Sequence, residues 1–236
     1  PMIANMMGVE YLPIKPGSAG KAVSGYDIRI FDENGKELGP NEEGYVVIKL
    51  PLPPGTLMDL WKDNERFKAG YLNKFPGYYF SGDGGYKDDD DYIYITGRVD
   101  DVINVAGHRL STAEMEEIVA SHHSVAECAV IGINDELKGQ IPLALVVAKS
   151  GENIEHFQLQ HEIVHLVREQ IGAVASLRDV VVVQRLPKTR SGKILRKMMR
   201  SIADGAEFQI PSTIDDVAII DEIKDVLEFS KIGYFK

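Results

Sequence analysis

Short runs in the first hundred residues alternate apolar and polar side chains, as β-strands do. Residues 26–31 alternate in this way, residues 32–35 contain an Asn-Gly turn, and residues 43–50 have the pattern of a strand that runs back along the first. The pattern predicts a β-hairpin. A second hairpin is predicted from a strand at 77–83, which runs into a glycine-rich turn, and a strand at 92–96.

Two further segments of this region have a distinct pattern. Residues 57–67 have helical spacing, and Trp61 and Phe67 fall on the apolar side of the predicted helix. Four aspartates occupy positions 88–91, which we interpret as a solvated hairpin tip rather than a metal site.

Past Arg98 the pattern changes to alternating helices and strands, which indicates a domain boundary near Asp100. Ser111 and Glu114 have the spacing of a capping box, so a helix is predicted from there to about Ser121. The other expected elements are strands at 125–133, 142–148 and 179–183 and helices at 154–171 and 194–202. The apolar face of the longer helix is predicted to contain Phe157, His161, Val164 and Val167. This order, α-β-β-α-β-α, is typical of an α/β domain.

Composition and charge restrict the class of protein. The 236 residues are 44% hydrophobic and 26% charged, which favours a soluble globular protein, and the net charge of -10 argues against a general nucleic-acid or acidic-membrane surface. The single cysteine, Cys128, excludes an internal disulfide and a multi-cysteine zinc site, and we expect it to be a buried core thiol. It favours a reducing compartment, the cytoplasm or, in a eukaryote, the mitochondrial matrix.

Two stretches contain candidate binding residues. Asp83 follows Ser-Gly at the expected end of a strand, where its carboxylate can accept both hydroxyls of a ribose; alternatively it accepts from turn amides. Further along, Arg98 and Arg109 flank two aspartates and a glycine. Arginine is suited to bidentate phosphate contacts. The alternative is an interdomain salt-bridge network.

A third stretch places Lys193 after a Ser-Gly turn, within a run from Arg185 to Arg200 that contains no acid. The Walker spacing of glycines is absent, so a nucleotide-cradling P-loop is excluded. Two interpretations remain. The loop is a flexible segment that carries one ammonium group to a developing negative charge, or it is an ordinary solvated basic loop. The six histidines have no convincing metal-site spacing, and His161 and His165 are interpreted as a surface pair.

Four motifs occur together in this order: YFSGDG at 79–84, ITGRVDDVINVAGHRL at 95–110, KGQ at 138–140 and LPKTRSGK at 186–193. In this combination the chain resembles the adenylate-forming acyl-CoA synthetases (AMP-binding enzymes), in their short-chain acetyl- and propionyl-CoA synthetase branch. The resemblance implies an α/β (α+β) fold in two parts. Residues 1–99 would be the β-rich C-terminal part of the large AMP-binding domain, and residues 100–236 the small mobile C-terminal domain with the catalytic lysine loop.

The resemblance also implies a two-step ligase. Carboxylate and Mg-ATP would give an acyl-adenylate and pyrophosphate, and coenzyme A would then displace AMP. The acid is expected to be acetate or propionate, and the Mg²⁺ ligands are expected upstream of this chain. The chain is expected to be inactive without the N-terminal part of the same protein, and to have no nucleic-acid or membrane partner.

Seven residues carry roles that follow from the resemblance. Asp83 would bind the ribose hydroxyls, Arg98 the ribose and phosphate region, and Lys193 would bridge the carboxylate and the α-phosphate. Asp100 would be the hinge between the two half-reactions. Gly107 would leave room for the pantetheine arm. Arg109 would contact the phosphate of the nucleotide, and Arg168 would contact a phosphate of coenzyme A.

Other functions remain open at this point. The chain is alternatively a non-catalytic fragment that binds nucleotide or coenzyme A, or part of an adenylation domain that loads a carrier protein. A nucleic-acid binder is a third reading of residues 185–200. Reversible acylation of Lys193, as in bacterial relatives, would remove its charge and block the first step alone.

Overall fold

The computed structural model describes residues 1–6, 8, 11–151 and 155–235. The chain divides into two compact units, unit 1 (residues 1–100) and unit 2 (residues 101–236). Within these described residues, no helix combines the length and the apolar character needed to cross a membrane.

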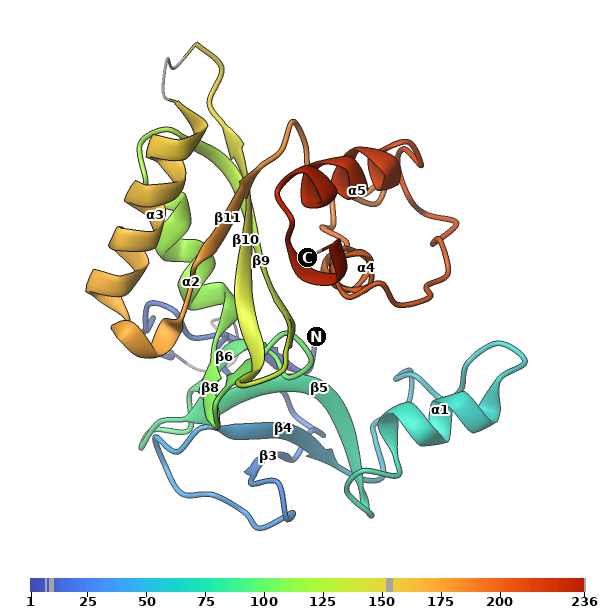
Figure 1. Ribbon diagram of the computed structural model, residues 1–236. Helices are drawn as coiled ribbons and strands as arrows, with labels where there is room; N and C mark the ends of the chain where they lie inside the picture. Colours follow the sequence, from blue (N-terminus) through green and yellow to red (C-terminus); the bar gives the residue numbers. More distant parts are fainter. Residues whose placement is uncertain (7, 9–10, 152–154, 236) are drawn as a thin grey trace. The chain divides into compact units, whose positions relative to one another are not determined.

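Unit 1 is built on a four-stranded antiparallel sheet with the order β3-β4-β5-β6 (Figure 1). Its elements are β1 (Ile3–Ala4), β2 (Lys21–Ala22), β3 (Ile28–Phe31), β4 (Gly44–Lys49), α1 (Asn64–Tyr71), β5 (Tyr78–Lys87) and β6 (Ile93–Arg98). Each sheet face has its own apolar cluster, one around Ile30 and Ile48 and the other around Phe31 and Val47. This alternation is the period-2 pattern of the sequence, and both predicted hairpins are confirmed.

Two details of unit 1 differ from the sequence prediction. The helix begins only at Asn64, because the Asp63 carboxylate accepts a hydrogen bond from the Arg66 amide and caps it there. Phe67 is buried, but Trp61 lies outside the helix and is 89% exposed, so the predicted apolar face was wrong at that residue. The glycine-rich stretch after residue 80 is also not a turn, since β5 continues through it to Lys87 with a register shift at Gly84.

Unit 2 is a sheet with helices on both faces (Figure 1). Its strands are β7 (Ile103–Val105), β8 (His108–Leu110), β9 (Val125–Asp135), β10 (Gly139–Ala148) and β11 (Asp179–Val182). Its helices are α2 (Thr112–Ala120), α3 (His156–Gln170), η1 (Ala173–Ala175), α4 (Arg196–Ala203), α5 (Ile219–Phe229) and η2 (Gly233–Phe235). β9 pairs antiparallel and β11 parallel with β10.

Alternate residues of the central strands supply the two layers of the core. Ile131 and Leu143 face α4 and α5, whereas Val130 and Ala144 face α2 and α3. These side chains are 0 to 1% exposed, so a change in the volume of any of them disturbs the packing of the side chains around it. The continuous apolar runs of β9 and β10 therefore reflect strands that are buried on both faces.

Most predicted elements of unit 2 are confirmed, with three corrections. The β7–β8 hairpin and helix α5 were missed, so the predicted order was incomplete. Helix α3 buries Leu159, Ile163 and Val167, whereas Phe157 is 80% exposed, so the predicted face was rotated. The predicted start of α3, residue 154, lies outside the described residues. The capping box is confirmed on its serine side, since Ser111 Oγ accepts from the Glu114 amide at 3.3 Å.

Candidate functional site

Asp83 and Arg98 lie directly opposite each other on β5 and β6 of unit 1. One guanidinium nitrogen of Arg98 donates to Asp83 Oδ1 at 3.3 Å and to the carbonyl of Ser81 at 3.1 Å. The hydroxyl of Ser81 in turn accepts from the Asp83 amide. The strand pairing therefore presents a carboxylate and a guanidinium together, which suits a ligand that has both hydroxyls and a phosphate.

Gly82 makes this approach possible. Its φ of 81° is in the left-handed region, and a Cβ built there would lie 2.6 Å from a guanidinium nitrogen of Arg98. Its carbonyl accepts from the Val99 amide, which fixes the chain just past β6. The positive φ favours a glycine at this position, and a larger side chain would also have to displace the Arg98 guanidinium.

Arg98 also contacts Asp100, because its Nε donates to Asp100 Oδ1 at 3.0 Å. Burial disfavours the charged form of Arg98, but the nearby carboxylates of Asp100 and Asp83 outweigh that effect and raise its pKa. Arg98 thus contacts two acids at the end of β6.

Gly107 lies in a two-residue turn between β7 and β8 of unit 2. Val105 and His108 pair across it, and Ala106 and Gly107 have φ values of 49° and 88°. Two successive positive φ angles match the twist of a tight hairpin, which is why a glycine follows Ala106. Apart from its chain neighbours, no atom of the described residues lies within 4 Å of a Cβ built on Gly107, so the tip of the hairpin is open.

Residues 138–140, the KGQ motif, hold this hairpin from the next strand. The carbonyl of Lys138 accepts from the Ala106 amide at 2.8 Å, and Gln140 Oε1 accepts from the Asn104 amide at 2.9 Å. Gly139 pairs with Val105. The motif therefore has a clear structural role beside the Gly107 turn, which its sequence alone did not indicate.

The other two candidate arginines lie on different elements of unit 2. Arg109 is exposed on β8, opposite Asn104. Arg168 is exposed in the last turn of α3 and lines a cavity of about 300 Å³. Lys138 and Arg178 line the same cavity, and Lys138 Nζ donates to Ser176 Oγ at 2.8 Å. Three cationic side chains thus line this cavity, which is suited to a phosphate group.

The Lys193 loop is a small hairpin. Lys188 and Ile194 form a β-bridge, the Thr189 amide donates to the Lys193 carbonyl at 2.9 Å, and the Lys193 amide donates to Thr189 Oγ1 at 3.1 Å. Gly192 has a φ of 84°, which the turn requires. Lys193 is exposed just past this turn.

Acids from elsewhere in unit 2 pair with some cations of the basic run. The pairs are Arg185 with Asp216 and Glu222, Lys188 with Glu127, and Arg196 with Glu116. Within the described part of the chain, Lys193 Nζ makes no ion pair. The charges of Arg185, Lys188 and Arg196 are therefore balanced by acids that are distant in the sequence.

Two of the histidines contact glutamates. His122 contacts Glu162 at 2.9 Å, and His165 contacts Glu169 at 3.5 Å on the same helix. In residues 1–6, 8, 11–151 and 155–235, no group of three or more His, Cys, Asp or Glu side chains is arranged to hold a metal ion.

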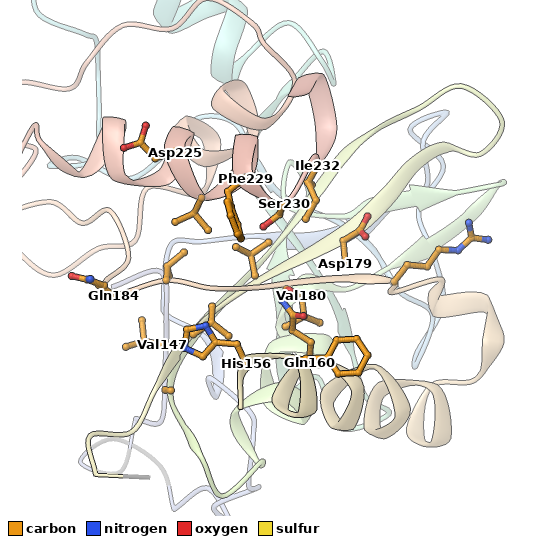
Figure 2. Close-up of a pocket in the computed structure, with 17 residues that line it drawn as sticks. Val147, His156, Gln160, Asp179, Val180, Gln184, Asp225, Phe229, Ser230 and Ile232 are labelled. Atoms are coloured by element: carbon orange, nitrogen blue, oxygen red, sulfur yellow. Dashed lines mark hydrogen bonds between the residues drawn. The ribbon is translucent and has the colours of Figure 1, made fainter. Parts of the chain in front are cut away.

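A second cavity in unit 2, of about 1090 Å³, follows β11 between α3 and α5 (Figure 2). His156 and Gln160 lie on one side of the strand and Phe229 and Ile232 on the other. Gln160 Nε2 donates to the Val180 carbonyl at 2.6 Å, so it caps part of the strand edge. Arg178, which lines the smaller cavity with Arg168 and Lys138, also lines this groove.

Comparison with known proteins identifies a family for part of the chain. The family described as AMP-binding enzyme C-terminal domain matches residues 114–193. An uncharacterized protein of Pseudomonas aeruginosa is 56% identical over 99% of this chain and 37% of its own length. Mitochondrial acyl-CoA synthetase short-chain family member 3 of Mus musculus is 50% identical over 90% of this chain and 31% of its own length.

A solved structure agrees with these relatives. The crystal structure of ATP-bound MatB from Rhodopseudomonas palustris has a TM-score of 0.67 and 28% identity over 79% of this chain and 35% of that protein. The chain spans about a third of the length of the curated relatives it matches, and it corresponds to their C-terminal part. The resemblance and the mixed α/β fold expected from the sequence are thereby confirmed.

Proposed function

Because residues 114–193 carry an AMP-binding enzyme C-terminal domain, we propose that this chain is the C-terminal part of a ligase that joins a short-chain carboxylate to coenzyme A. In the first half-reaction a carboxylate oxygen attacks the α-phosphorus of ATP, and the bond to pyrophosphate breaks. In the second, the thiol sulfur of coenzyme A attacks the acyl carbon, and AMP leaves. Acetate and propionate are the proposed acids.

The surroundings of Lys193 carry this proposal. Its loop is fixed by backbone hydrogen bonds and its side chain is exposed. Its ammonium has no ion-pair partner among the described residues, whereas Lys188 and Arg196 pair with acids. An ammonium held in this way is suited to charge that appears only as carboxylate and α-phosphate meet. Lys193 is accordingly the proposed catalytic residue of the first half-reaction.

Residues of both units have proposed nucleotide roles. Asp83 accepts from the ribose hydroxyls, Arg98 contacts the ribose and phosphate region, and Arg109 contacts the nucleotide phosphate. The pairing of Asp83 with Arg98 supports the first two assignments. Asp100, at the boundary of the two units, is the proposed hinge between the half-reactions. Mg²⁺ that accompanies ATP has no proposed ligand in this chain.

Coenzyme A is the proposed acyl acceptor, rather than a carrier protein. The cavity lined by Arg168, Lys138 and Arg178 supports this choice, because a phosphate of free coenzyme A suits a cavity lined by cations. The open tip at Gly107 is proposed to admit the pantetheine arm. Without the upstream part of the protein, the chain is proposed to be inactive and not to bind ATP productively.

The test separates the two half-reactions in the complete protein that contains this chain. Lys193→Ala is expected to lower carboxylate-dependent pyrophosphate release by about 10²- to 10³-fold, as loss of a transition-state donor does. Thioester formation from a preformed acyl-adenylate and coenzyme A is expected to change by less than about threefold. Lys197→Ala, an exposed lysine of the same basic run, is the matched control. Equal loss in both half-reactions would contradict the role of Lys193.

A further inference from the structure

A segment near the C-terminus lies along the Lys193 loop. We call residues 212–227 the C-terminal brace; it ends within α5 and lies beyond the region that the family description matches. The Arg190 amide donates to the Thr213 carbonyl at 2.9 Å, and the Asp215 amide donates to the Lys188 carbonyl at 3.0 Å. Thr189 and Ile214 form a β-bridge between these two bonds. The loop is thus paired on its outer side with the brace.

An ion-pair clamp fastens the brace to the segment between β11 and the loop. Both Nε and a terminal nitrogen of Arg185 donate to the carboxylate of Glu222, at 3.1 and 2.5 Å. Asp216 Oδ2 lies 2.8 Å from Arg185 as well. A forked guanidinium that meets two carboxylates has a defined geometry, which a single lysine pair lacks.

Apolar burial anchors the other side of the brace. Ile214, Ile223 and Leu227 are 1 to 6% exposed and belong to the core cluster that includes Met199 of α4. Helix α4 begins three residues after Lys193. The loop is therefore held between the brace and a helix that share one core.

We propose that the C-terminal brace positions Lys193 for the first half-reaction, and that Arg185, Asp216 and Glu222 are positioning residues for it. The loop contains Gly192 and has few apolar side chains of its own, so backbone pairing on both sides is what limits the positions of the ammonium group. A displacement of a reacting group by about 1 Å costs on the order of 10²-fold in rate. This inference rests on the proposed role of Lys193.

The first test measures the brace without any activity. Amide hydrogen exchange of Arg190 and Asp215 reports directly on the two bonds between loop and brace. In Asp216→Asn/Glu222→Gln, exchange of these two amides is expected to rise about tenfold, while the core amides of β10 change by less than about twofold. Asp221→Asn/Glu228→Gln is the control, because it removes two exposed acids from the same helix. Unchanged exchange at both amides would overturn the proposal.

The second test uses the half-reactions of the complete protein. Pyrophosphate release is expected to fall about tenfold in Asp216→Asn/Glu222→Gln, with thioester formation from preformed acyl-adenylate within about twofold of the unmodified protein. An equal fall in both would mean general destabilisation and would overturn the positioning role. If the double variant does not fold, Arg185→Lys, which keeps the charge and loses the fork, is measured instead.

The proposed function and the brace fail in different ways. If Lys193→Ala keeps full pyrophosphate release, the role of Lys193 is wrong and the positioning proposal falls with it. If Lys193→Ala loses pyrophosphate release while Asp216→Asn/Glu222→Gln keeps it, the positioning proposal alone is overturned.

Discussion

Lys188 and Lys193 stand in the same loop and have different surroundings. Lys188 Nζ contacts both carboxylate oxygens of Glu127, at 2.6 and 2.7 Å. Lys193 has no such partner among the described residues. Lys188 therefore holds the loop in place, whereas Lys193, five positions later, is available to a ligand. Residue type alone does not distinguish them, because both are lysines in a basic run and lysine is usually found at the surface.

Cys128 provides a prediction at the scale of one residue. It is half-buried rather than fully buried, and its Sγ donates to the Glu116 carbonyl at 3.4 Å. Burial, with the nearby Glu116 charge, raises the pKa of the thiol to about 11. At pH 8 we expect iodoacetamide to modify Cys128 about a hundredfold more slowly than an ordinary thiol, because the thiolate is the nucleophile. Mass spectrometry of the folded and unfolded chain measures this.

The same pKa has a consequence for stability. The thiol loses its proton more readily in the unfolded chain, so its contribution is fully present below the unfolded pKa and is lost as pH rises through about 11. The free energy of unfolding should therefore fall above pH 9 more steeply than in Cys128→Ser. A folded-state alkylation rate equal to that of the unfolded chain would contradict both expectations.

At the scale of elements, the β7–β8 hairpin depends on residues from β10. Gln140→Ala removes the acceptor of the Asn104 amide and leaves the Gly107 turn with less support. If that turn admits the pantetheine arm, thioester formation from preformed acyl-adenylate should fall about tenfold, with pyrophosphate release nearly unchanged. Gln158→Ala, on the exposed surface of α3, is the control. An effect confined to pyrophosphate release would contradict the assignment of this hairpin to the second step.

The pair of Glu116 and Arg196 joins α2 to α4. Glu116 accepts from Arg196 at 2.9 and 2.7 Å and from the Val130 amide at 2.8 Å, and its side chain is 17% exposed. We expect Glu116→Gln to lower the free energy of unfolding by about 2 kcal/mol, because a partly buried arginine loses its charged partner. Urea denaturation measures this against Glu117→Gln, an exposed neighbour for which the change should be under about 0.5 kcal/mol.

At the scale of the whole molecule, the chain changes character at Asp100. Unit 1 has an antiparallel sheet and unit 2 a mixed sheet with helices on both faces. If Asp100 is the hinge, Asp100→Pro should hinder the change between half-reactions, because proline fixes φ. We expect overall turnover of the complete protein to fall about tenfold, with each half-reaction in single turnover within about threefold.

Asp100→Ala controls for the loss of the carboxylate that contacts Arg98. It removes the side chain and keeps the freedom of φ. If Asp100→Ala and Asp100→Pro reduce turnover equally, the carboxylate rather than the backbone is responsible, and the hinge is not at this residue.

Periodicity by itself determined where most strands and helices of this protein lie. The buried runs of β9 and β10 and the serine cap of α2 depend on local pattern, so they were predicted correctly. The motifs also identified the family, because their order and spacing are properties of the sequence. The prediction failed at Trp61 and Phe157, where apolar residues are exposed and local spacing does not say which face is covered.

Only the tertiary structure decided which charges meet. Arg185 and Glu222 are 37 residues apart, and Arg196 and Glu116 are 80 apart, yet each pair is in contact in the folded chain. The brace along the Lys193 loop and the support of the Gly107 turn by Gln140 are likewise contacts between distant segments. Ion pairs and backbone bridges of this kind depend on packing around a common core, which residue spacing does not specify.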